Sequence, residues 1–150
     1  MDITMNANTI PSTGTTTAAR AGAPSRARIW TGRTLSALAT LFLLFDSVAK
    51  LLRPAPVIKG TVELGYPVSA IVPIGVVLLA CTVVYLVPRT AIIGAVLLTG
   101  YLGGAVASQV RVGNPLPTHV LFPLYFAALI WGGLYLRDRR VGALLAPRRG

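Results

Sequence analysis

Asp46 and Lys50 are the residues whose types and spacing bear most directly on chemistry, because they place opposite charges in the apolar run FLLFDSVAKLL. A separation of four residues puts both side chains on one face of a helix, and the acidic residue comes first, which favours an ion pair. An unpaired carboxylate is costly in lipid, so we expect Asp46 to face the interior of a helix bundle. Lys50 has a longer stem that can reach the membrane surface.

Further polar side chains are predicted to lie on the same side of the membrane as Asp46. They come from helix ends and loops, and we expect a polar cluster with Asp46 at its floor, formed with Lys50, Lys59, Glu63, Gln109, Arg111 and His119. Ionisable residues at membrane depth are candidates for function. Three interpretations stay open: an ion pair that fixes a helix to a loop, a site for a small molecule or a proton, and a contact with a partner protein.

Other catalytic or metal chemistry finds little support in the sequence. Cys81 is the single cysteine, which excludes a disulfide within the chain and a CxxC pair. His119 is the single histidine, so one chain cannot supply two histidines to a haem. We find no glycine-rich phosphate loop and no Ser-His-Asp arrangement. We therefore assign no catalytic residue and no metal ligand, and the motifs do not favour an enzyme.

The composition indicates a membrane protein that would position these residues on helices. Hydrophobic residues make up 54% of the chain and charged residues 12%, and the mean hydropathy is +0.70. Four apolar segments, at 32–52, 67–87, 90–110 and 118–136, each approach the roughly 20 residues that a helix needs to cross a bilayer. We expect an all-α fold, an up-down antiparallel bundle of four transmembrane helices.

The connecting segments carry their own signals. Between the second and third apolar segments, Pro88 is expected to end one helix and the Thr90 hydroxyl to cap the next. The segment RVGNPLPT is a dense turn signal before the fourth. The first loop, RPAPVIKGTVELGYP, has apolar residues at helical spacing, which predicts a short interfacial helix that covers the outer mouth of the bundle.

Charge distribution predicts the domain limits and the orientation. We expect a disordered, polar and basic tail at 1–29, the membrane domain at 30–138 and a basic tail at 139–150. Ten of the 14 Lys and Arg residues fall on the side of the two tails, so both termini are predicted to be cytoplasmic. The Ala, Arg, Gly and Val bias favours a bacterial cytoplasmic membrane over an organelle. The net charge is +10, but the sequence has no face that combines basic with aromatic residues, so nucleic-acid binding is not expected.

Small residues recur every four positions along the third apolar segment. They form two neighbouring stripes, Gly100, Gly104 and Ser108 beside Thr99, Gly103 and Ala107. Small residues allow close approach of helices in lipid, where no hydrophobic force drives the helices together. We favour packing within one four-helix bundle, and a homo-oligomer interface is the alternative.

Several stretches together resemble the DoxX-like family of small four-helix membrane proteins. They are LFDSVAKLL, ELGYP, LVPRTAIIGAVLLTGYLGGAVA and HVLFPLYFAALIWGGLYLRD, within residues 30–138. The resemblance implies a lysine at the position of Lys50, a polar residue at the end of the third helix and a histidine at the start of the fourth. In this sequence, Gln109 stands at the polar position at the end of the third helix, and His119 stands at the start of the fourth. Because Gln109 is not a histidine, a haem or metal held by two histidines is not favoured.

The resemblance implies the fold more strongly than an activity. Relatives resemble accessory components of membrane redox or oxidative-stress complexes, so we expect a non-catalytic or quinone-associated partner in such a system, with the lipid bilayer and a membrane redox complex as its surroundings. A quinone is the candidate ligand, because it needs an apolar slot with polar groups at one end. The alternatives are an assembly factor that acts through helix contacts, and a small proton-coupled transporter.

Overall fold

The computed structural model describes residues 26–138 and 140–141, and the fold of this part is all-α, as the sequence predicts. Four stretches are long and apolar enough to cross a membrane, which confirms the expected bundle. In chain order, the elements are α1 (Arg26–Leu52), α2 (Ala55–Glu63), the 3₁₀ turn η1 (Val68–Ala70), α3 (Ile71–Leu86), α4 (Ala91–Arg111), the π-helical turn η2 (Leu116–Val120) and α5 (Phe122–Arg137).

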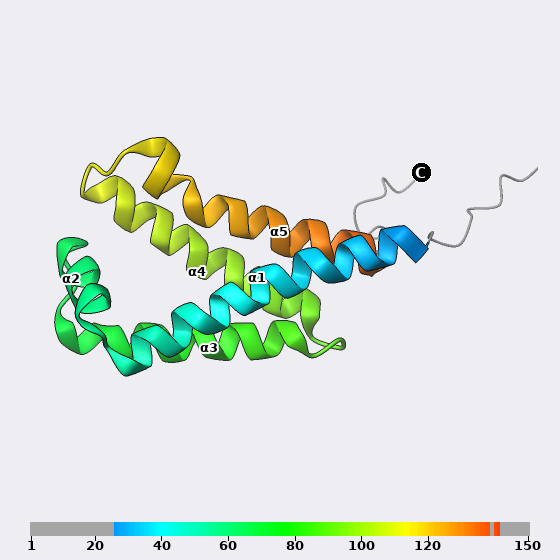
Figure 1. Ribbon diagram of the computed structural model, residues 1–150, viewed down its shortest axis with the longest axis horizontal. Coiled ribbons are helices and arrows are strands. Elements are labelled where there is room, and N and C mark those ends of the chain that lie inside the picture. The colour runs from blue at the N-terminus through cyan, green and yellow to red at the C-terminus, as the bar shows by residue number, and fades with distance from the viewer. Residues whose placement is uncertain (1–25, 139, 142–150) are drawn as a thin grey trace, which may run out of the picture.

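The four long helices form a closed ring in the order α1, α3, α4 and α5. Each packs against the next, and α5 packs in turn against α1 (Figure 1). Buried aliphatic side chains from all four helices meet at the centre, including Leu43, Leu78, Leu98, Ile130 and Leu134. Since neighbouring helices in this ring run in opposite directions, the bundle is up-down antiparallel.

The outer surface of the bundle is apolar as well. Large hydrophobic side chains on every long helix are exposed, among them Phe45, Val76, Ile93 and Tyr125. An apolar surface of this kind suits lipid, which solvates hydrocarbon side chains as well as a protein core does. The chain is therefore built as a multi-pass membrane protein.

The hairpin between α3 and α4 differs from its prediction in one detail. Thr90 does precede α4, but its hydroxyl donates to the carbonyl of Val84 at 2.8 Å and makes no bond to the first turn of α4. The backbone of Thr90 has φ −110° and ψ 7°, outside the extended conformation in which a residue usually caps the helix after it. The hydroxyl instead satisfies a carbonyl that the end of α3 leaves free.

The short helix expected in the first loop is present as α2, and the helical ends extend beyond the predicted membrane domain. Residues 26–29 were expected in the tail but belong to α1. At the other end, Val141 is helical and buried, so part of the predicted C-terminal tail packs on the core. Arg140 is also helical, and the remaining residues of both predicted tails lie outside the described part.

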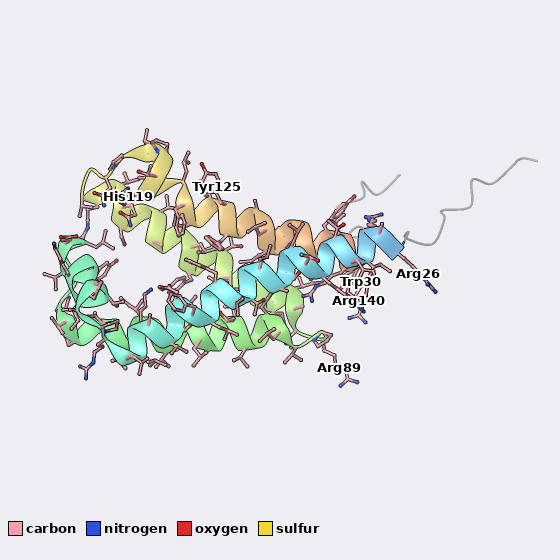
Figure 2. All side chains as sticks on the ribbon, in the orientation of Figure 1. Arg26, Trp30, Arg89, His119, Tyr125 and Arg140 are labelled. Atoms are coloured by element: carbon pink, nitrogen blue, oxygen red, sulfur yellow. The ribbon has the colours of Figure 1, made fainter. Side chains whose placement is uncertain are left out.

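The two ends of the bundle differ in charge and in packing. One end, here called the basic end, carries the starts of α1 and α4 and the ends of α3 and α5, and Arg26, Arg89 and Arg140 lie there (Figure 2). His119 lies at the opposite end, here called the α2 end. At the α2 end, α4 and α5 lie on one side and α1 and α3 on the other, with α2 beside them (Figure 1).

Candidate functional site

A cavity of about 470 Å³ occupies the α2 end of the bundle. All four long helices line it, and α2 and the segment after it contribute Thr61, Leu64 and Tyr66. Ligand pockets commonly measure ~300–1,000 Å³ and are mostly apolar with a few polar groups, and this cavity matches that description. It is the best candidate site in the described part of the chain.

Three phenylalanines form one wall of the cavity. Phe42 on α1 stacks on Phe126 of α5 with ring centroids 4.1 Å apart. Phe122 meets both rings edge-on, at 5.6 Å from Phe42 and 5.1 Å from Phe126. Edge-on contacts are a favourable geometry for aromatic pairs, and the three rings together give the cavity a flat apolar wall.

Asp46 and Lys50 are ion-paired, as their spacing predicts. Lys50 Nζ donates to both carboxylate oxygens of Asp46 at 2.5 Å. Both residues line the cavity. The side chain of Asp46 is 33% exposed and that of Lys50 is 18% exposed. The pair has no net charge, which lowers the cost of placing two ionised groups at membrane depth. An ammonium has three N–H groups, so Lys50 can still donate to a further acceptor.

Two contacts join the loop after α2 to the end of α4. The Tyr66 hydroxyl lies 2.7 Å from Ser108 Oγ, and Ser108 itself donates to the carbonyl of Gly104 at 2.8 Å. Arg111 donates to the carbonyl of Leu64 at 2.6 Å, and its guanidinium lies 5.7 Å from the centre of the Tyr66 ring. These contacts hold the rim of the cavity on the α2 side.

Gln109 also lines the cavity and is fixed by its side-chain oxygen. Asn114 Nδ2 donates to Gln109 Oε1 at 2.5 Å. This bond orients the amide and leaves the N–H groups of Gln109 as donors. Gln109 and Lys50 therefore bring donors to the cavity from two different helices, α4 and α1.

The predicted polar cluster is thus partly assembled. Asp46, Lys50 and Gln109 line the cavity, and Arg111 lies at its rim. Glu63 is exposed on α2 and lies 4.0 Å from Lys59, and it does not line the cavity. His119 is also exposed, and its Nδ1 lies 2.8 Å from the Thr118 hydroxyl. Neither residue lines the cavity, so lying at the same end of the bundle does not bring Glu63 and His119 to the site.

The three glycines of the predicted α4 stripes do not make the close helix contacts expected within the bundle. A Cβ atom added at Gly100, Gly103 or Gly104 would meet nothing within 4 Å. Gly100, Gly104 and Ser108 line the cavity instead. Close approach occurs elsewhere: the Gly133 position on α5 contacts Gly32 and Ser36 of α1. The alternative role, a homo-oligomer interface, stays a prediction for the exposed Gly103.

Sequence reasoning missed the aromatic part of the site. Tyr66 and Tyr101 line the cavity with the three phenylalanines. One signal was available, because Phe122 and Phe126 are four residues apart and so share a helix face. Their pairing with Phe42 depends on the contact between α5 and α1, which the sequence pattern does not specify.

Comparison with known proteins assigns the chain to a family. A family model described as the DoxX-like family matches residues 34–133. None of the curated proteins and none of the solved structures compared with the chain matches it. In the described part of the chain, no three His, Cys, Asp or Glu residues lie together as metal ligands would.

Proposed function

Because this chain belongs to the DoxX-like family, we propose that it binds a quinone-type molecule in the cavity at the α2 end and serves as an accessory component of a membrane redox system. The accessory role follows the family resemblance. The binding role rests on one observation, the juxtaposition of the phenylalanine wall with N–H donors from Lys50 and Gln109 in one cavity.

The chemistry of the cavity matches a flat, uncharged ring with carbonyl groups. Phe42, Phe122 and Phe126 supply aromatic surface against which such a ring can stack. Lys50 and Gln109 supply donors for carbonyl oxygens. An anionic ligand is disfavoured, because Asp46 lies beside the Lys50 ammonium and neutralises it.

The position of the cavity also suits a ligand that dissolves in the bilayer. The cavity lies among membrane-spanning helices, and its lining is mainly apolar. A quinone with an isoprenoid tail could place its ring in the cavity and leave the tail in lipid. The transporter alternative gains less support, because Asp46 is already engaged by Lys50 and is not an isolated carboxylate at the membrane centre.

Equilibrium binding of decylubiquinone to the full chain in lipid nanodiscs tests this function. Lys50→Met removes a charged donor, for which ~1.5–3 kcal/mol is typical, so we expect binding at least about tenfold weaker. Lys59→Met is the matched control, because it makes the same change on the exposed face of α2, away from the cavity. Binding should be unchanged in that variant.

A second pair of variants tests the cavity without altering charge. Gly104 lines the cavity and has free space at its Cβ position, so Gly104→Leu should fill the cavity and abolish binding. Gly103→Leu adds the same side chain at a neighbouring position that does not line the cavity, and it should bind normally. The proposal fails if decylubiquinone does not bind the unmodified protein saturably, or if each variant behaves like its control.

A further inference from the structure

A second cavity, of about 340 Å³, lies at the basic end, where α1, α3 and α5 meet. Its polar lining includes two arginines, Arg33 on α1 and Arg137 at the end of α5, and no acidic residue lines it. The cavity is separate from the candidate quinone site, which lies at the α2 end of the bundle. Its positive charge and its position favour a different class of ligand.

Arg137 has hydrogen-bonding capacity that the described residues do not use. Its guanidinium lies 5.2 Å from the centre of the Tyr85 ring, and its Nη2 is buried with no hydrogen-bond partner among the residues described. The Tyr85 hydroxyl is engaged elsewhere, at 3.0 Å from Ser36 Oγ and 3.2 Å from the carbonyl of Ile130. Buried N–H groups almost always have a partner, so an acceptor from outside the described chain is expected here.

The acceptor should be an anion. Among the described residues, the two ion pairs are Lys50–Asp46 and Lys59–Glu63, both at the α2 end, so neither Arg33 nor Arg137 is neutralised by a carboxylate. A guanidinium presents a planar fork of donors that matches the oxygens of a phosphate. Two arginines at one cavity thus fit a phosphate group.

An apolar groove continues from the arginines along α1. Ala37, Leu41 and Leu44 line it, and Leu86 of α3 forms its other side. From Arg33 to Leu44 the helix rises about 16 Å. One leaflet of the hydrocarbon core is ~15 Å thick, half of the roughly 30 Å total. The groove therefore has the length of one acyl chain in one leaflet, with the arginines at its polar end.

We propose that Arg33 and Arg137 bind the phosphate of an anionic phospholipid from the leaflet at the basic end, and that one acyl chain lies along Ala37, Leu41 and Leu44. Basic pockets between transmembrane helices are known places for acidic lipid headgroups. The groove favours a lipid over free phosphate, because only a lipid has an acyl chain that can bind along its apolar surface. This site does not depend on the proposed quinone function.

Native mass spectrometry of the full chain tests the proposal, with dioleoylphosphatidylglycerol, dioleoylphosphatidylcholine and inorganic phosphate as three separate probes. We expect phosphatidylglycerol to bind about tenfold more tightly than the zwitterionic phosphatidylcholine. Arg137→Gln should weaken phosphatidylglycerol binding about tenfold. Arg89→Gln is the matched control, because it removes an exposed arginine at the same end that does not line the cavity, and binding should be unchanged.

Ala37→Phe keeps the test decisive if Arg137→Gln does not fold. Ala37 is exposed on the lipid-facing side of α1, so the larger side chain is tolerated but should fill the groove and weaken phosphatidylglycerol binding. Three results would each overturn the proposal. They are an equal loss in Arg89→Gln, tight binding of inorganic phosphate without selective lipid binding, and lipid binding that Ala37→Phe leaves intact.

Discussion

Gly94 is the position where adding one methyl group should do most harm to the bundle. The residue lies on α4 where this helix leaves the hairpin, and it is fully packed against α3. A Cβ atom at this position would overlap the backbone Cα and N of Tyr85 and lie 2.7 Å from its Cβ. Because the atoms in the way are mainly backbone, Gly94→Ala forces the two helices apart.

The magnitude follows from two opposing effects. An alanine in a helix is favoured over glycine by up to ~1 kcal/mol. Overpacking a core typically costs ~1–3 kcal/mol, and the cost should be near the upper end where backbone must move. We therefore expect Gly94→Ala to lower the free energy of unfolding by about 2 kcal/mol.

A matched variant on the same helix isolates the packing effect. Gly103 has nothing within 4 Å of its Cβ position, so Gly103→Ala gains the helix preference without any clash. The two variants should differ by about 3 kcal/mol. Unfolding in mixed micelles by titration with sodium dodecyl sulfate, followed by circular dichroism, measures this difference. The reasoning is refuted if Gly94→Ala is as stable as Gly103→Ala.

Three further predictions concern charge, capping and orientation. Lys50→Met should destabilise the bundle by ~1–3 kcal/mol, because it leaves the Asp46 carboxylate without its partner. The double variant Lys50→Met with Asp46→Leu should recover most of this loss. Equal free energies of unfolding for the single and double variants would contradict the prediction. Thr90→Val should cost ~1 kcal/mol by freeing a carbonyl at the end of α3, whereas Thr90→Ser should retain stability, and thermal denaturation in detergent distinguishes them. For orientation, a cysteine that replaces Lys59 should react with an impermeant maleimide added to intact cells, and a cysteine that replaces Arg89 should not. The reverse labelling pattern would show that the predicted orientation is wrong.

The sequence predicted the helices well because lipid imposes a simple length and polarity requirement. Each of the four apolar segments becomes a membrane-length stretch, with ends that move by a few residues. The Asp46 and Lys50 pair was also predictable, since it depends on spacing within one helix.

Features that depend on how two helices meet were not predictable in the same way. The glycine stripe of α4 suggested close packing, yet close contacts are made by isolated glycines, such as Gly32, Gly75 and Gly94. A lone glycine carries no periodic signal, so its role emerges only from the partner helix. His119 shows the converse, because we expected it to join the polar cluster around Asp46, yet its side chain is exposed and does not line the cavity.

The two ends of the bundle should also differ in stiffness. At the basic end, backbone meets backbone, through Gly94 against Tyr85 and Gly32 against Gly133. At the α2 end, Gly75 of α3 likewise packs on the backbone of Ser47 in α1, whereas the loop after α2 is joined to α4 through the side chains of Tyr66 and Arg111. Local opening requires less free energy where fewer packed contacts must break. Thermal fluctuation should therefore first separate α4 from the loop after α2, which would let a lipid-dissolved molecule enter the cavity from the side while the basic end stays closed.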